Sequence, residues 1–126
     1  MALYNVIRGH FDAAHCLPNY NGKCANLHGH RWVVEVGVKA FSDEYLDNGD
    51  MLIDFHKMKE ILEKEVLDIF DHSLVNDILD MPTSENITMW IVRRLRQAFS
   101  ELASVYYSLD KVRVYESPDA YTEWRA

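Results

Sequence analysis

Alternation of apolar and other residues between positions 32 and 39 limits the possible fold more than any other feature of the sequence. Every second residue there is large and apolar: Trp32, Val34, Val36 and Val38. Successive side chains of a strand point to opposite faces, so this period of two predicts a strand with one face against a core. Residues 4–15 alternate more loosely and place on one face Ile7, Phe11, Ala13 and His15. We predict that the two strands pair antiparallel, joined by a loop from Cys16 to Leu27 long enough to carry function.

Two helices and two further strands are predicted from the remaining sequence. Asp54 can cap a helix whose apolar positions are Phe55, Met58, Ile61, Leu62, Val66 and Ile69. Thr83 can cap a second, with the apolar positions Ile87, Trp90, Ile91, Leu95, Ala98 and Phe99. Residues 70–81 between them have no clear periodicity. A third strand follows with Val112, Val114 and Glu116 on one face, and residues 120–125 can return as a fourth.

The predicted order is therefore ββααββ, an α+β fold with a four-stranded antiparallel sheet and two helices on one of its faces. A chain of 126 residues is long enough for one domain and too short for two, so we expect a single domain over residues 1–126. Such a sheet has two bare edges, and bare edges invite pairing with other chains. We expect a homo-oligomer.

Charge and hydropathy exclude several classes of partner. Thirteen Lys and Arg against twenty Asp and Glu give a net charge of −7, the wrong balance for a protein that binds nucleic acid. No apolar run approaches the ~18 residues that span a bilayer, and the N-terminus lacks the pattern of a signal peptide, so we expect a cytoplasmic protein with no membrane partner. A disulfide between Cys16 and Cys24 is disfavoured in that setting.

Three of the six histidines form a pattern that predicts a metal site. His28 and His30 are two residues apart and share the parity of Trp32, while His15 ends the apolar face of the preceding strand. If the strands pair, three imidazoles converge at the mouth of the hairpin, and neutral imidazole is a preferred ligand of zinc. Three protein ligands leave one position open, which is typical of catalytic zinc. The alternative is three ordinary strand histidines beside a loop.

Cys24 lies in the same loop, four residues before His28 and next to Lys23. A neighbouring ammonium and a nearby dication would both favour its thiolate, and so make it a useful base or nucleophile. A fourth zinc ligand or a small buried apolar residue are the alternatives. We interpret Cys16 as structural.

Asp71, His72 and Glu116 are further candidates. Asp71 and His72 stand together after the first helix and are either a polar pair at its end or, with a thiol, part of a proton relay. Glu116 shares the face of two apolar strand residues, so its carboxylate must be paired or bind a ligand. Either a structural salt bridge or the paired N–H donors of a guanidine-like heterocycle edge would satisfy it.

Five segments of the chain resemble the 6-pyruvoyl-tetrahydropterin synthase family, in the same order and nearly end to end. They are FDAAH at 11–15, GKCANLHGH at 22–30, DH at 71–72, PTSEN at 82–86 and YESP at 115–118. Three residues separate Cys24 from His28, which resembles the 6-carboxy-tetrahydropterin synthase branch of queuosine biosynthesis. The pyruvoyl enzymes typically have five.

The resemblance implies a tunnelling fold whose subunits join their sheets into a barrel, usually as a hexamer with active sites between subunits. His15, His28 and His30 would hold Zn²⁺, and Cys24 would move protons at the substrate side chain. Asp71 and His72 would complete the relay from a neighbouring subunit. Glu116, with Thr83 and Ser84, would hold the pterin. The implied reaction converts 7,8-dihydroneopterin triphosphate into 6-carboxy-5,6,7,8-tetrahydropterin, acetaldehyde and triphosphate.

One departure from the family concerns the triphosphate. Cys16 stands where many members have a basic residue. Lys23 and Arg31 are the remaining candidates for contact with the phosphates.

Overall fold

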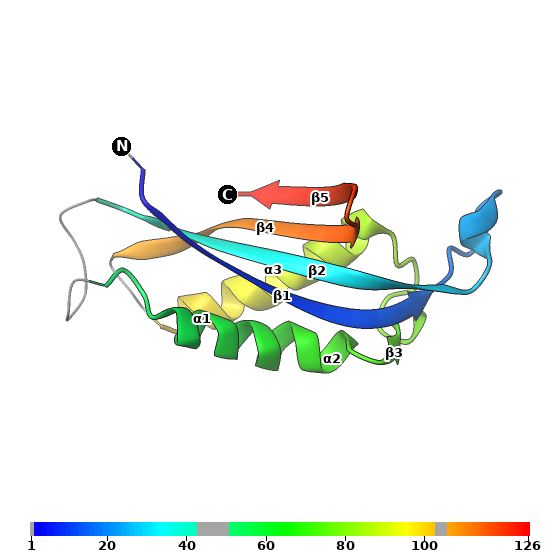
Figure 1. Ribbon diagram of the computed structural model, residues 1–126, viewed down its shortest axis with the longest axis horizontal. Helices are drawn as coiled ribbons and strands as arrows, with labels where there is room; N and C mark the ends of the chain where they lie inside the picture. Colours follow the sequence, from blue (N-terminus) through cyan, green and yellow to red (C-terminus); the bar gives the residue numbers. More distant parts are fainter. Residues whose placement is uncertain (1, 43–50, 103–105) are drawn as a thin grey trace.

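A computed structural model describes residues 2–42, 51–102 and 106–126. A long hairpin opens the chain and ends at a projecting loop, which contains a short 3₁₀ turn (Lys23–Ala25) (Figure 1). A helical segment and a second helix lie together beneath the sheet, and two strands close the chain. The elements are β1 (Tyr4–His15), β2 (His28–Ala40), α1 (Phe55–Leu62), a π-helical turn (Glu63–Leu67), α2 (Asp68–Phe70), β3 (Ser73–Leu74), a 3₁₀ turn (Val75–Asp77), α3 (Ser84–Ser100), β4 (Tyr107–Ser117) and β5 (Ala120–Arg125).

The sheet has five strands in the order β3-β1-β2-β4-β5, not the four that we predicted. Four of them pair antiparallel as expected, and the first hairpin runs in register from Tyr4 opposite Lys39 to His15 opposite His28. The fifth, β3, lies parallel to β1 and makes the sheet mixed. Two residues are too few to show a period, so sequence alternation could not reveal this strand.

The core lies between one face of the sheet and the helices that cover this face. The alternating positions predicted to face inward on β1, β2 and β4 are buried, among them Phe11, Trp32, Val34 and Val114, each 0% exposed. The helices pack against these strand residues with a further set of buried side chains: Met58, Leu62, Val66, Phe70, Ile87, Ile91 and Leu95. Both helices cover the same face, as predicted.

Both predicted helix caps are present. The Asp54 carboxylate accepts from the backbone N–H of His56 at 2.8 Å, and the Thr83 hydroxyl accepts from that of Asn86 at 3.1 Å. The apolar stripe of the first helix differs from the prediction, because Phe55 is 51% exposed and Phe70 is fully buried in place of the partly buried Ile69. The π-helical turn explains the shift at Phe70, since its wider hydrogen-bond spacing delays the helical period. Within the described ranges, no helix is long and apolar enough to cross a membrane.

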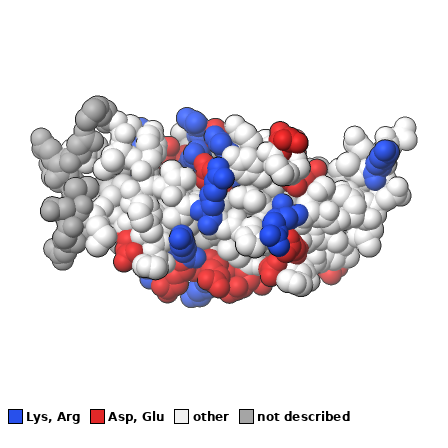
Figure 2. All heavy atoms as spheres, in the orientation of Figure 1, with Lys and Arg blue, Asp and Glu red and all other residues white. Residues whose placement is uncertain are grey.

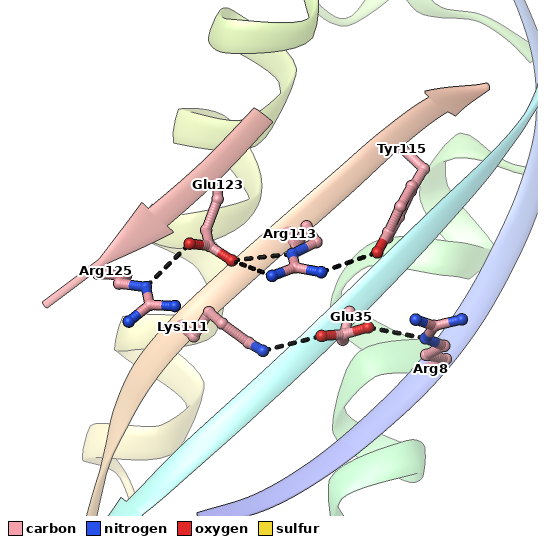
Figure 3. Close-up of polar contacts among 7 residues, drawn as sticks. All are labelled: Arg8, Glu35, Lys111, Arg113, Tyr115, Glu123 and Arg125. Atoms are coloured by element: carbon pink, nitrogen blue, oxygen red, sulfur yellow. Dashed lines mark hydrogen bonds and ion pairs between the residues drawn. The ribbon is translucent and has the colours of Figure 1, made fainter. Parts of the chain in front are cut away.

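The other face of the sheet carries charged side chains in place of helices (Figure 3). Glu35 on β2 accepts from Arg8 on β1 at 2.7 Å and from Lys111 on β4 at 2.8 Å, so one carboxylate ties three strands together. Burial raises the pKa of Glu35, but these two hydrogen bonds outweigh it and hold that pKa below its ordinary value. In Figure 2, Lys and Arg lie across the strands and acidic groups gather along the lower edge, over the first helical layer.

Candidate metal centre and adjoining pocket

The imidazoles of His15, His28 and His30 meet at the end of the β1–β2 hairpin, as the sequence predicts. One ring nitrogen of each lies within 4.8 Å of those of the other two. The ring centroids are 4.5 Å apart for His15 and His28 and 4.8 Å apart for His28 and His30. His15 and His28 face each other directly in the ladder, and His30 follows two residues later on the same face of the strand. The strand period is therefore what brings the three rings together.

Hydrogen bonds to backbone carbonyls orient two of these rings. Nδ1 of His15 lies 2.9 Å from the carbonyl oxygen of Pro82, and Nδ1 of His28 lies 2.6 Å from that of Asn26. A carbonyl oxygen only accepts, so Nδ1 carries the hydrogen and Nε2 keeps a free lone pair. In the described part of the chain, Nε2 of His15 and of His30 are buried and have no hydrogen-bond partner. Buried polar atoms are seldom left unpaired, so this donor set fits a divalent metal such as zinc.

Trp32 forms the floor beneath two of the histidines. Its ring lies edge-on to His15 at 5.0 Å and to His30 at 5.3 Å, and its Nε1–H donates to the carbonyl of Ala13. This apolar floor excludes water from the inner side of the site. Burial lowers the pKa of His30; the Glu116 carboxylate opposes the change, and the neighbouring histidines add to it. A lower pKa keeps His30 neutral, the form that binds a metal.

Glu116 lies at the rim of the histidine group, as its strand parity predicted. Its Oε1 is 3.7 Å from Nε2 of His30, and the side chain is 33% exposed. It lines a hollow of about 690 Å³ together with Arg8, Gly29, His30, Arg31, Val33, Tyr115, Ser117 and Pro118. The ladder between β2 and β4 ends at Val33 and Tyr115, so beyond that point β2 continues without β4 beside it. The hollow has the size of a small-molecule site.

Thr83 and Ser84 begin α3 close to the same place. The neighbouring Pro82 accepts from His15, which ties the start of α3 to the histidine group. The Thr83 hydroxyl is engaged in capping the helix, and the Ser84 hydroxyl lies 2.8 Å from that of Thr122 on β5. Both hydroxyls thus hold the start of α3 in position.

Cys24 and Lys23 lie on the projecting loop. Both cysteines are free thiols, and the backbone carbonyl of Cys24 accepts from the N–H of Leu17 at 2.8 Å across the loop. Among the described residues, the group that could hold a metal ion does not include Cys24. The side chain of Lys23 is exposed. The structure therefore holds the loop close to the histidines but does not gather Cys24 among the ligands.

Asp71 and His72 form the predicted pair at the outer edge of β1. The Asp71 carboxylate accepts from the backbone N–H of Asp12 at 2.9 Å and lies 2.8 Å from Nδ1 of His72. These two hydrogen bonds, the one from Asp12 first, hold the pKa of Asp71 below its ordinary value. His72 has a left-handed backbone (φ 61°) and donates its own N–H to the Asp12 carbonyl. Its side chain is 82% exposed and stands apart from the three histidines.

Sequence reasoning missed the groups that hold the candidate ligands in place. The carbonyls of Pro82 and Asn26 orient two histidines, and the Trp32 ring lies under the site. Backbone carbonyls have no signature in a sequence, because every residue has one. Trp32 was recognised as a core residue, and its position two residues after His30 on the same face was the available signal.

These observations define a class of protein: an α+β fold with helices on one face of a mixed sheet and, at one end, three histidines that could hold a metal ion. The sequence profile of the family described as 6-pyruvoyl tetrahydropterin synthase matches residues 5–126. The chain belongs to this family.

Individual relatives agree with this membership. The chain is 41% identical over 93 residues to the 6-carboxy-5,6,7,8-tetrahydropterin synthase of Synechocystis, a match covering 70% of each chain. It is 36% identical over 92 residues to the dihydroneopterin monophosphate aldolase of Pyrococcus furiosus, covering 73% of this chain and 74% of that one. The 6-pyruvoyl tetrahydropterin synthase of Caenorhabditis elegans has the same fold, with a TM-score of 0.82 at 24% identity, over 100% of this chain and 96% of that one.

Proposed function

We propose that this chain is a zinc-dependent lyase of queuosine biosynthesis, one tunnelling-fold domain over residues 1–126. It converts 7,8-dihydroneopterin triphosphate into 6-carboxy-5,6,7,8-tetrahydropterin and releases acetaldehyde and triphosphate. The convergence of three imidazoles, with Nε2 of His15 and of His30 buried and without a hydrogen-bond partner, is the observation that carries the proposal. The Synechocystis relative named for this product supports the choice of reaction.

The proposal gives each candidate residue a role. His15, His28 and His30 hold zinc, which when bound acts as a Lewis acid toward an oxygen of the substrate. Cys24 takes and returns protons at the substrate side chain. Glu116 binds the amino-pyrimidine edge of the pterin in the adjoining hollow, because two carboxylate oxygens match two parallel N–H donors.

Asp71 and His72 act as the second proton-transferring group. Asp71 orients His72 through Nδ1, which leaves Nε2 of His72 free to exchange a proton. Because the His72 side chain is 82% exposed at the edge of the sheet, we assign this pair to the site of a neighbouring subunit in a cytoplasmic homo-oligomer, a hexamer closed as a barrel. The family resemblance assigns Thr83 and Ser84 to pterin binding with Glu116, and Lys23 is the candidate for contact with the triphosphate.

The test is to incubate zinc-loaded protein with dihydroneopterin triphosphate and identify both the pterin and the small carbonyl product. Acetaldehyde together with 6-carboxy-tetrahydropterin is the expected result. Triphosphate release without acetaldehyde would instead indicate the pyruvoyl-type elimination. Absence of turnover in protein that holds zinc would indicate a non-catalytic zinc or pterin-binding module.

The phosphorylation state of the substrate is tested in the same assay. The Pyrococcus furiosus relative is named for a dihydroneopterin monophosphate. The proposed reaction instead predicts that the triphosphate is used with a higher kcat/KM than the monophosphate, and the reverse order would favour an activity like that of the aldolase.

A further inference from the structure

Residues 71–76 form a segment that lies alongside the end of β1, next to the three histidines, and bonds to it along its length. At one end, Asp71 and His72 bind the backbone of Asp12. In the middle, β3 pairs with Ala13 and Ala14. The ladder then stops, because the chain turns into the 3₁₀ turn that begins at Val75.

At the other end, the Asn76 side chain takes the place of the missing ladder partner. Its Oδ1 accepts from the backbone N–H of Cys16 at 3.0 Å, and its Nδ2–H donates to the carbonyl of Cys16 at 2.9 Å. One amide therefore satisfies both backbone groups of a residue 60 positions away, in the manner of a strand neighbour. Asn76 is partly buried, so water competes less for these bonds than at an exposed site.

Cys16 joins His15, the first candidate metal ligand, to the loop that carries Cys24. It directly follows His15, whose ring is held by Pro82. It directly precedes Leu17, whose N–H donates to the carbonyl of Cys24. A fixed Cys16 backbone therefore fixes the direction in which the chain leaves His15 and the point at which it meets Cys24.

We propose that Asn76 is a positioning residue of the metal centre: its paired hydrogen bonds to Cys16 set the place of His15 and of the Cys24 loop. The inference rests on the three-histidine site of the proposed function, but it needs no particular substrate. A group that hydrogen-bonds a metal ligand directly typically contributes about 10–100-fold to metal affinity, and because Asn76 acts one residue away from His15 we expect an effect at the lower end of this range. Loss of the pair should therefore weaken metal binding and release the loop.

The experiment measures zinc affinity by competition with a chromophoric chelator, and the alkylation rate of Cys24 by mass spectrometry of its peptide, in the full chain. Asn76→Ala is expected to bind zinc about tenfold more weakly and to alkylate at Cys24 several-fold faster in the zinc-free form. Asn76→Asp nearly keeps the volume of the side chain and replaces the donor facing the Cys16 carbonyl with a repelling oxygen. It is expected to show both changes without opening a cavity.

Asn5→Ala is the matched control. The Asn5 side chain also makes a long-range, partly buried bond to backbone, from its Nδ2–H to the carbonyl of Ile53 at 3.0 Å, but near the opposite end of β1. The Asn5→Ala variant should have a lower free energy of unfolding than the wild type, with unchanged zinc affinity and an unchanged rate of Cys24 alkylation. If a folded Asn76 variant keeps wild-type zinc affinity and alkylation, or if Asn5→Ala weakens zinc equally, the proposal is wrong.

The outcome is separable from that of the proposed function. Protein that binds zinc and responds to Asn76 substitution but forms no acetaldehyde would overturn the lyase assignment and leave this inference standing. An active lyase whose zinc affinity is unchanged by Asn76 substitution would overturn this inference and leave the lyase assignment standing.

Discussion

A backbone carbonyl at Nδ1 leaves Nε2 available in two of the three histidines, and burial keeps the third ring neutral. Pro82 fixes His15 from the start of α3, and Asn26 fixes His28 from within the loop. His30 instead depends on burial against Trp32, which lowers its pKa and keeps the ring neutral. Two ligands are thus oriented by long-range or loop carbonyls, and one by packing in the hairpin itself.

Replacement of a single ligand tests the metal centre directly. His28→Ala should reduce bound zinc from about one ion per chain to near none after dialysis, because two imidazoles hold the ion far more weakly than three. Metal content is measured by elemental analysis with the protein concentration. His10→Ala, a histidine of the same hairpin on the opposite face of β1, should retain zinc, and equal loss in both variants would remove the three-histidine assignment.

Glu35 is the residue on which the helix-free face depends most. Its side chain is only 7% exposed, and Glu35→Gln leaves two cations facing a neutral amide. We expect about 1–3 kcal/mol lower free energy of unfolding at pH 7, measured by urea titration.

The same variant gives a pH prediction with a definite sign. The folded-state pKa of Glu35 lies below its ordinary value of 4.5, so its contribution is present above that value and is lost as the pH falls through the folded-state pKa. The stability difference between wild type and Glu35→Gln should therefore shrink at acid pH. A difference that stays constant between pH 7 and the lowest pH at which both fold would contradict the assigned ion pairs.

Among the elements, the π-helical turn and β1 fit each other through a glycine. A Cβ at Gly9 would lie 2.7 Å from Cδ1 of Leu67 and 3.0 Å from Cδ2 of Leu62. The ends of two leucine side chains, one from the turn and one from the end of α1, therefore lie against the backbone of β1 at Gly9 and would have to move to admit a Cβ. The same turn shifts the buried stripe so that Phe70 faces the core.

Gly9→Ala should consequently force the Leu67 and Leu62 side chains to repack. Overpacking of this kind costs about 1–3 kcal/mol, seen as a lower midpoint of thermal or urea unfolding. Gly37→Ala is the comparison, because a Cβ there meets its nearest neighbours at 3.5 Å, an ordinary contact. Equal destabilisation by both substitutions would argue against close packing at Gly9.

For the whole molecule, the separation of the histidine group from the Asp71–His72 pair matters most. One chain carries both, yet His72 is exposed at the sheet edge and stands outside the metal-ligating group. Within the described residues, β1 pairs with β3 only at Ala13 and Ala14, and in the earlier part of β1 the apolar side chains of Tyr4 and Val6 are exposed. An assembly in which such an edge is covered would complete the site from two chains.

Mixing of inactive variants tests this shared site. Cys24→Ala and His72→Ala should each abolish turnover alone, and hetero-oligomers formed by co-expression should recover roughly a quarter of wild-type activity, since half of each contributing group is intact. Native mass spectrometry supplies the subunit number, expected to be six. No recovery in confirmed hetero-oligomers of two inactive variants would mean that both groups act within one chain, and activity in either single variant would mean that the replaced group is not needed.

Local periodicity accounts for what could be predicted from the sequence. A period of two gave β1, β2 and β4, their inward faces and the convergence of His15, His28 and His30, because alternation and pairing of two strands settle all of these together. The caps at Asp54 and Thr83 are equally local, since each involves atoms two or three residues away.

The tertiary structure alone decided the features that join distant parts of the chain. Three such contacts link residues about 60 or more positions apart: the pairing of β3 with β1, the contact of Pro82 with His15, and the hydrogen bonds of Asn76 to Cys16. They are made by backbone groups or by a single side-chain amide. No pattern in the sequence marks such pairs. They form because packing of the helical layer on the sheet brings residues 71–84 against the end of β1, where each buried polar group must find a partner.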